Sequence, residues 1–328
     1  MKESDHHEVP GRQKILEVRE IIAPYVHHTP VLTCATLDAM TGGSLYFKCE
    51  NFQKAGSFKI RGASHTVMTL PDGDAVRGVA THSSGNHAQA LALAAGMRGI
   101  NAHIVMPENA PKIKVSAVES YGGHIHFCRP TLPDRERTLQ EVIKECGAVE
   151  VHPYNDYRII AGQATAAAEL FEDAPSLDCL VVPVGGGGLL SGSALSAAYF
   201  SPGTRVYGAE PEKANDAWQS FREKQLIPSS KPQTIADGLR TSLGSRTFPI
   251  ILERVADILT TDEESIVQAM HWIWERMKIV VEPSAAVALA AILNHRDLFA
   301  GKHTGVILSG GNTDLYRLPW TEQTTCNH

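Results

Sequence analysis

The sequence predicts an α/β fold in which parallel-rich, twisted sheets are flanked by helices and divided between two domains. Short runs of β-favouring residues alternate with Ala- and Leu-rich runs of helical period, which is the pattern of parallel strands joined by crossover helices. The length of 328 residues exceeds that of one average domain. Hydrophobic residues make up 43% and charged residues 20% of the chain, so a disordered or fibrous protein is excluded.

The expected elements alternate along most of the chain. We expect strands at residues 78–81, 102–105, 124–128, 179–184, 205–209 and 305–308. We expect helices at residues 86–97, 139–146, 162–170, 189–200, 263–277 and 284–293. Turn-forming residues near 75–78 and 152–155 predict a small domain of three strands at 77–154 and a large domain at 1–76 and 155–328. Ligands often bind in the cleft between two such domains.

Charge, cysteine content and hydropathy exclude several classes of protein. The chain has 30 Lys and Arg against 36 Asp and Glu, a net charge of −6, so we expect no nucleic-acid partner. No 18-residue apolar run and no apolar leader is present, so we expect neither a membrane span nor export. The cysteines form no C-x-x-C pair and are expected to be buried, free thiols in a cytoplasmic protein. These cysteines are Cys34, Cys49, Cys128, Cys146, Cys179 and Cys326.

The strongest local motif is a run of four glycines, Gly185, Gly186, Gly187 and Gly188, between an expected strand and an expected helix. Backbone amides converge in such a turn, and the helix dipole adds positive potential, so the turn suits a phosphate group. The spacing matches neither a Walker loop nor a dinucleotide fingerprint. A small phosphorylated cofactor is therefore favoured over a nucleotide, and a purely structural tight turn is the alternative.

Lys59 lies near the start of a helix expected after the sequence SFKIRGA. The positive end of the helix dipole and the neighbouring Arg61 would both disfavour its ammonium form and favour a nucleophilic amine. Bonding of this amine to an aldehyde is chemically reasonable. A lysine taken alone is more often a solvated surface residue, so this interpretation depends on the other motifs.

Two further polar turns follow apolar strands. The sequence Ser83-Ser84-Gly85-Asn86-His87 begins an Ala- and Leu-rich helix, so it can cap that helix or hold a substrate carboxylate. The sequence from Ser309 to Asn312 follows the strand expected at 305–308. With the glycine run, three polar turns lie at the carboxyl ends of strands, which predicts one shared crevice.

Together, these motifs resemble the fold-type II pyridoxal-phosphate enzymes, which have a tryptophan synthase β-like architecture, and specifically the serine racemase and serine/threonine dehydratase family. The resemblance covers nearly the whole chain. Further matching stretches are Phe52-Gln53-Lys54, Ala161-Gly162-Gln163, Ile235-Ala236-Asp237-Gly238 and Val281-Glu282-Pro283-Ser284.

The resemblance implies a cofactor, pyridoxal 5'-phosphate, and residues that hold it. Lys59 would bond to the cofactor aldehyde, the four glycines would bind its phosphate, and Asn86 would contact the ring hydroxyl. Phe58 would pack beside the ring, and Ser309 would meet the pyridine nitrogen. A neutral hydroxyl cannot keep that nitrogen protonated as a carboxylate would, which favours prompt loss of a β-substituent.

The resemblance also implies catalytic and substrate-binding residues. The freed amine of Lys59 would take the Cα proton on one face of the substrate, and Ser84 would lie on the other face. Reprotonation from Ser84 would give the opposite enantiomer, whereas loss of the β-hydroxyl would give a 2-oxo acid and ammonia. Ser83, Asn86 and His87 would receive the substrate carboxylate. Arg135 would be a closing contact, and a solvated helix charge is its alternative role.

A divalent cation site and regulatory partners follow from the resemblance alone. Glu210, Asp216 and the carbonyl of Ala214 would bind Mg²⁺, Mn²⁺ or Ca²⁺, although acidic pairs in loops are usually just solvated. A homodimer is expected. A nucleotide effector would involve three residues, with Ala55 departing from the threonine usual beside them. These three are Lys54, Tyr121 and Lys278.

The expected function is a pyridoxal-phosphate-dependent dehydratase, or ammonia-lyase, of small L-serine- or L-threonine-type 3-hydroxy amino acids, with serine racemase activity. A predominant serine racemase and a 3-hydroxyaspartate dehydratase are alternatives. The last would need a cation for the second carboxylate, which Arg135, His152 or Arg158 could supply. The chain ends soon after Asn312, which speaks against the regulatory domain of biosynthetic threonine dehydratases. A non-catalytic cofactor- or nucleotide-sensing protein and an ATP-dependent transferase are more distant hypotheses.

Overall fold

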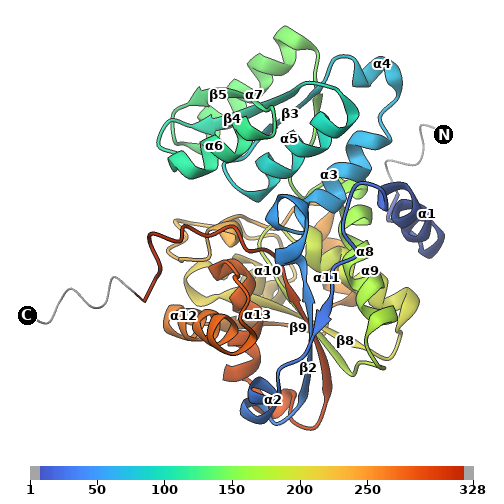
Figure 1. Cartoon of the computed structure of the whole chain (residues 1–328), viewed down its shortest axis with the longest axis vertical. Helices are drawn as coiled ribbons and strands as arrows, with labels where there is room; N and C mark the ends of the chain where they lie inside the picture. Colours follow the sequence, from blue (N-terminus) through green and yellow to red (C-terminus); the bar gives the residue numbers. More distant parts are fainter. Residues whose placement is uncertain (1–7, 321–328) are drawn as a thin grey trace, which may run out of the picture.

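The computed structural model describes residues 8–320, so Cys326 lies outside the described residues. Two separate sheets form the framework, with the smaller one in the upper part and the larger one in the lower part of Figure 1. Each expected strand overlaps an observed strand, and the expected α/β class is confirmed. Among the described residues, no helix has both the length and the apolar character needed to cross a bilayer.

The larger sheet has six strands in the order β1-β2-β10-β7-β8-β9. Strands β1 and β2 pair antiparallel, and every other neighbouring pair is parallel. Strands β1, β2 and β9 were not expected, because β1 has two residues and β2 and β9 show no clear alternation of apolar and polar residues. The bounds are Val31–Leu32 (β1), Ser44–Cys49 (β2), Cys179–Pro183 (β7), Arg205–Pro211 (β8), Asp257–Thr261 (β9) and His303–Leu308 (β10).

The smaller sheet has the parallel order β5-β4-β3-β6. Its strands are Val79–His82 (β3), Ala102–Pro107 (β4), His124–Cys128 (β5) and Val149–Glu150 (β6). All of them lie inside the region 77–154. The expectation of three strands there was wrong, because the two-residue strand β6 is too short to show periodicity in the sequence. The domain boundaries themselves stay a prediction.

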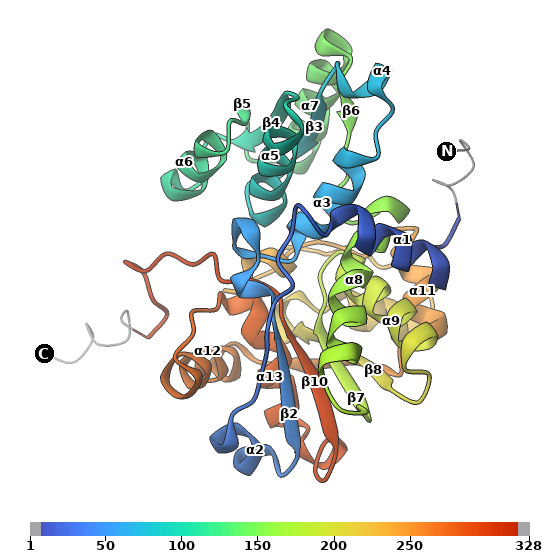
Figure 2. The same cartoon turned by 45° about the vertical axis from the view of Figure 1, so that its right-hand side comes forward.

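Helices cover both faces of the larger sheet. Helices α12 and α13 lie on one side of it, and α8 and α9 lie on the other (Figure 2). The bounds are α1 Arg12–Ile22, α2 Ala35–Thr41, α8 Tyr157–Asp173, α9 Gly188–Phe200, α10 Asp216–Glu223, α11 Thr247–Arg254, α12 Glu263–Trp272 and α13 Pro283–Asn294. Helix α13 is apolar on all sides, and accordingly its residues 284–292 are all buried.

The remaining helices accompany the smaller sheet or lead into it. They are α3 Lys59–Met68, α4 Asp72–Ala75, α5 Asn86–Arg98, α6 Lys112–Ser120 and α7 Leu132–Cys146. Helix α7 begins earlier than the expected 139–146, because the Thr131 hydroxyl caps it by accepting from the Asp134 amide. The helix expected at 263–277 ends as α12 at Trp272 and continues as the π-helical turn Ile273–Met277.

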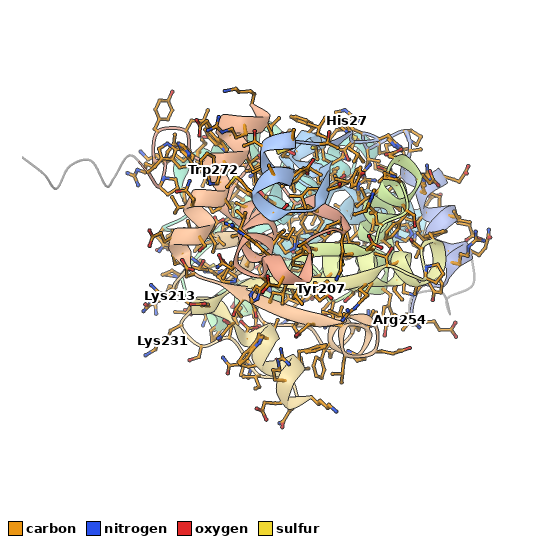
Figure 3. The ribbon with its side chains drawn as sticks, turned by 90° about the horizontal axis from the view of Figure 1, so that it is seen from below. His27, Tyr207, Lys213, Lys231, Arg254 and Trp272 are labelled. Carbon is orange, nitrogen blue, oxygen red and sulfur yellow. The ribbon has the colours of Figure 1, made fainter. Side chains whose placement is uncertain are left out.

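The hydrophobic core of the larger sheet contains one large aromatic contact. Tyr207 on β8 is 2% exposed and packs edge-on against Phe299, with ring centroids 5.5 Å apart. Seen from below, Tyr207 lies near the middle of the molecule (Figure 3). This buried aromatic contact contributes to the packing of the core under the larger sheet.

A buried ion network joins α3 to the larger sheet. The Arg61 guanidinium, which is fully buried, donates to Glu50 Oε2 at 2.8 Å and to both carboxylate oxygens of Glu169 at 2.7 Å. Lys48 Nζ lies 2.8 Å from Glu169 Oε2 and donates to the Thr29 carbonyl at 2.7 Å. Burial, the largest single effect, would raise the pKa of Glu169, but the hydrogen bonds and charges of Arg61 and Lys48 together outweigh it and lower that pKa to about 2.

Replacing Arg61 tests how much this network stabilises the fold. In Arg61→Met, Glu50 and Glu169 keep their charges without a guanidinium partner, so we expect the free energy of unfolding to fall by about 3–5 kcal/mol. Urea denaturation followed by circular dichroism measures the change.

The matched control is Arg137→Met, which removes an exposed guanidinium paired with Asp134 on α7. An exposed pair contributes about 0–1 kcal/mol, so this variant should unfold close to the wild type. Equal losses in both variants would contradict a stabilising role of the buried network.

Candidate active site

A cavity of about 690 Å³ opens at the carboxyl ends of strands from both sheets. The turns after β3, β7 and β10 all line it, so the predicted convergence of the three polar turns is found. The lining includes each residue that the resemblance assigns to the cofactor or to the first carboxylate of the substrate, and also Ser84 and Arg135. They are Phe58, Lys59, Ser83, Ser84, Asn86, His87, Arg135, Gly185, Gly186, Gly187, Gly188 and Ser309.

Lys59 is the first residue of α3 and faces the cavity. Its Nζ donates to the Pro153 carbonyl at 2.8 Å and lies 5.2 Å from the centre of the Phe58 ring. Burial lowers the pKa of this amine to about 8, against the opposing effect of the Glu282 carboxyl. Arg61 was expected to lower it, and this was wrong, because the Arg61 guanidinium is engaged with Glu50 and Glu169. The amine is therefore easier to deprotonate than an ordinary lysine, as a nucleophile or base requires.

The glycine run joins β7 to α9 and has room for no side chain. A Cβ on Gly186 would lie 2.3 Å from the Tyr154 ring, and Gly187 adopts a φ of +86°. Within the described residues, the amides of Gly185, Gly186 and Gly187 donate no intramolecular hydrogen bond. Free amides at the N-terminus of a helix fit a phosphate group, so the loop meets the requirement of the expected cofactor.

Glu282 is a cavity residue to which the sequence assigned no role. It is 4% exposed, and its Oε1 accepts from Asn86 Nδ2 at 2.7 Å. Asn312 Nδ2 donates in turn to Asn86 Oδ1 at 2.9 Å, so the amide of Asn86 is held from both sides. Burial, with the nearby charge of Asp237, raises the pKa of Glu282 to about 8. The signal for Glu282 was its place in a matching stretch, but burial and partners cannot be read from sequence.

The turn after β3 presents its polar groups at the start of α5. The Gly85 amide donates to Ser83 Oγ at 3.3 Å. The His87 ring is buried and its Nε2–H donates to the Val151 carbonyl at 3.0 Å. Burial and the charge of Lys59 lower the pKa of His87 to about 3, so the ring is neutral. The neutral ring has one N–H, which already bonds to Val151. The backbone amide of His87 is therefore the group left for the expected contact with a substrate carboxylate.

Ser309 and Phe58 lie at the floor of the cavity where β10 ends. Ser309 is 4% exposed, and its carbonyl accepts from the Phe58 amide at 3.1 Å. This bond ties the strand end to the residue just before Lys59. The Phe58 ring lies 5.2 Å from the Lys59 amine, and Ser309 lines the same cavity.

The three residues expected to supply a cation for a second substrate carboxylate differ in position. Arg135 and His152 line the cavity, whereas Arg158 is not among the lining residues and pairs with Asp156 at 2.6 Å. No ion pair of Arg135 is found within residues 8–320, and its buried Nε lacks a hydrogen-bond partner. Arg135 is thus available to a ligand, and Arg158 is not.

The residues expected to bind a divalent cation lie outside the cavity. Both oxygens of Glu210 are used, because they accept from the amides of Ala217 and Trp218 at 2.9 and 2.8 Å. Asp216 is 3% exposed, and within residues 8–320 its two buried carboxylate oxygens accept no hydrogen bond of normal geometry, although the nearby Ser229 side chain favours its charged form. Within the described part of the chain, no group of three His, Cys, Asp or Glu side chains forms a metal site. Two carboxylates with a backbone carbonyl, and two buried carboxylate oxygens, still fit a hard cation.

The family described as pyridoxal-phosphate dependent enzyme matches residues 22–310. The chain is 48% identical to a beta-hydroxyaspartate dehydratase from Paracoccus denitrificans, over 95% of this chain and 99% of that protein. It is also 48% identical to a serine racemase from Oryza sativa subsp. indica, over 92% and 90% of the two chains. The solved structure of maize serine racemase superposes with a TM-score of 0.92 at 46% identity, covering 96% of this chain and 97% of that one. The chain therefore belongs to the fold-type II pyridoxal-phosphate dependent enzymes, in the group of serine racemases and hydroxy amino acid dehydratases.

Proposed function

We propose that this enzyme eliminates water from small L-serine- or L-threonine-type 3-hydroxy amino acids, giving a 2-oxo acid and ammonia, and that it also racemises serine. The observation that carries the proposal is the easily deprotonated amine of Lys59 in the cavity that Ser84 also lines. Two proton-transferring groups in one cavity suit both removal and return of a Cα proton.

Different residues of the cavity hold the cofactor, transfer protons and bind the substrate carboxylate. The cofactor, held by Phe58, Lys59, Asn86, the four glycines and Ser309, supplies an electron sink for the carbanion at Cα when bound. Lys59 Nζ removes the Cα proton from one side, and Ser84 Oγ returns a proton from the other. Ser83, Asn86 and the amide of His87 hold the substrate carboxylate at the start of α5, where the helix dipole favours an anion.

Two alternatives lie within the same chemistry. A predominant serine racemase would return the proton faster than the β-hydroxyl leaves. A 3-hydroxyaspartate dehydratase would need a partner for a second carboxylate, and the unpaired Arg135 supports this candidate. Release of 2-oxo acid and inversion of configuration, measured on serine, threonine and 3-hydroxyaspartate, decide among the three. Activity on none of these substrates would overturn the proposed function.

We propose that Glu210, Asp216 and the Ala214 carbonyl hold Mg²⁺, Mn²⁺ or Ca²⁺. The support is the pair of buried oxygens on Asp216, which within the described residues accept no hydrogen bond of normal geometry. Burial raises the pKa of Asp216 to about 6, and burial raises that of Glu210 well above its ordinary value. A bound divalent cation would offset the cost of keeping both carboxylates charged in this region.

A homodimer, a nucleotide effector and a cytoplasmic location are further proposals. Exposed Phe52 and Val280 lie close together, since the Asn51 side chain donates to the Val280 carbonyl, and they offer an apolar contact to a second copy. The five described cysteines are free thiols, as the cytoplasm favours. Lys54, Tyr121 and Lys278, proposed for the nucleotide, lie on three different segments.

Lys59→Ala tests the cofactor lysine. Incubation with pyridoxal 5'-phosphate and then borohydride should label the wild type at residue 59 and leave that position unlabelled in the variant. Because the neutral amine is the nucleophile, labelling of the wild type at short times should rise with pH and level off above about pH 8. Peptide mass spectrometry measures both results.

Lys114→Gln is the control, since Lys114 lines the same cavity and pairs with Asp237. It should keep the label on residue 59. A wild-type protein labelled elsewhere would contradict the assignment of Lys59.

Ser84→Ala tests the second proton-transferring group. Formation of D-serine from L-serine should fall by roughly 100-fold or more, because the proton donor on one face is lost. Release of 2-oxo acid from L-serine needs only the Lys59 side and should persist. Chiral chromatography and a coupled keto-acid assay on the same samples measure the two rates, and an equal fall in both would rule out separate roles.

Asp216→Asn tests the cation site. Saturating Mg²⁺, Mn²⁺ or Ca²⁺ should raise the thermal midpoint of the wild type by a few degrees, since binding at 100 times Kd adds about 2.7 kcal/mol. The variant should lose this increase, whereas Glu212→Gln, an exposed carboxylate nearby, should retain it. A cation-dependent midpoint in Asp216→Asn would place the cation elsewhere.

A further inference from the structure

Three nitrogen-bearing side chains line the part of the cavity wall contributed by the smaller sheet. His82 ends β3, His152 follows β6, and Arg135 lies in the first turns of α7. The electrostatic influence of His82 reaches His152, and that of Arg135 reaches His82. The charge of Lys59 also acts on His152, so the three side chains lie near one another in the same cavity as the amine.

His152 has a fixed tautomer. Its Nδ1 accepts two backbone hydrogen bonds, from the Tyr154 amide at 3.2 Å and from the Asn155 amide at 2.9 Å. A ring nitrogen that accepts two N–H groups carries no proton, so the proton of the neutral ring is on Nε2. Within the described residues, Nε2 has no hydrogen-bond partner. A hydrogen-bond donor is thus left free on a residue that lines the cavity.

The ring of His152 is also held in place. The Tyr154 ring packs edge-on against it, with centroids 4.6 Å apart, and Tyr154 Oη shares a hydrogen bond of 3.0 Å with Thr241 Oγ1. The Asn155 side chain donates to Ser245 Oγ at 3.2 Å and accepts from the Arg246 amide at 2.7 Å. These contacts join the segment that follows β6 to the loop at residues 241–246, which precedes α11. A donor so constrained loses little conformational entropy when it binds a ligand.

Burial, with His82 and Lys59 adding to it, lowers the pKa of His152 to about 4. The ring is therefore neutral near pH 7 and acts as a directional donor. The positive charge among these three side chains belongs to Arg135. Of the acidic residues that line the cavity, Asp237 pairs with Lys114 and Glu282 accepts from Asn86, while Glu136 is exposed on α7.

We propose that His152 is a specificity-determining residue, whose Nε2–H donates to a second carboxylate of the substrate while Arg135 pairs with the same group. The inference rests on the proposed function and adds a preference, within its substrate class, for 3-hydroxy amino acids with two carboxylates. Serine and threonine have no group that can take up both donors, and a site that leaves buried donors unpaired discriminates against such substrates.

Two substitutions separate the donor from the structural role of the ring. In His152→Asn, the side-chain oxygen replaces Nδ1 as acceptor for the backbone amides, but the donor at Nε2 is lost. In His152→Gln, the side-chain NH₂ reaches the position of Nε2 and restores a donor. His103→Asn is the control, because His103 lies on β4 outside the cavity, where it bonds to His126.

The holoenzymes are compared by ammonia release from 3-hydroxyaspartate and from serine. His152→Asn should raise KM for 3-hydroxyaspartate by roughly 10- to 100-fold, the effect of losing one hydrogen bond to a charged group. Its KM for serine should stay near the wild-type value, and His152→Gln should recover much of the loss. Equal changes with both substrates, or none with either, would overturn the role of His152.

Binding of acids that the enzyme cannot convert tests the second-carboxylate site without relying on the proposed reaction. Calorimetry with succinate, which has two carboxylates, and butyrate, which has one, measures the second-carboxylate site directly. Succinate should bind the wild type more tightly than butyrate does, and His152→Asn should remove most of the difference. A wild type that turns over no hydroxy amino acid yet shows this pattern would refute the proposed reaction and keep the site, whereas equal binding of both acids would refute the site.

Discussion

The chemistry at Lys59 depends on the anchoring of its neighbour Arg61 two residues along the same helix. Burial lowers the pKa of the Lys59 amine and so favours its nucleophilic, unprotonated form, and the helix that carries it must stay fixed at the edge of the cavity. The Arg61 guanidinium, bonded to Glu50 and Glu169, fixes α3 from the side of the larger sheet. Arg61 has its own carboxylate partners and stays charged. Lys59, which lies apart from them, can lose its proton near neutral pH.

The position of the cavity follows from strand direction. Strands β3, β7 and β10 are parallel to their neighbours within two different sheets, and each ends in a polar turn at the cavity. In parallel sheets the carboxyl ends gather on one edge, so three turns distant in sequence are brought together. The free amides of the glycine run and the start of α5 then concentrate positive potential on one side, which suits the anionic groups of a cofactor and a substrate.

Contiguous motifs could be predicted from the sequence, and contacts between distant segments could not. Lys59, the glycines and Ser84 lie in short motifs from which a nucleophile, a phosphate-binding turn and a polar turn could be predicted. All of them line the cavity. Glu282 lies in a matching stretch, but the sequence could not assign it a role. Its raised pKa arises from burial and from its position near Asp237. Tyr154 was also missed, because its packing on Gly186 joins a loop to a turn about thirty positions later in the chain. Short strands such as β1 and β6 lack the length for any periodicity.

The smaller sheet and its flanking segments carry most of the residues to which we assign substrate contacts, and they share Asn86 with the proposed cofactor site. The larger sheet carries the glycines and Ser309, whereas Ser84, Arg135 and His152 belong to the smaller sheet and its flanking segments. Relatives named for a racemase and for a dehydratase are equally identical to this chain, so overall identity does not separate these activities. A few donors on the smaller-sheet side of the cavity can change the preferred β-substituent without disturbing the cofactor. The proposed substrate specificity would therefore depend on side-chain orientation, as at His152, where two backbone amides bond to Nδ1 and leave Nε2 as the ring donor.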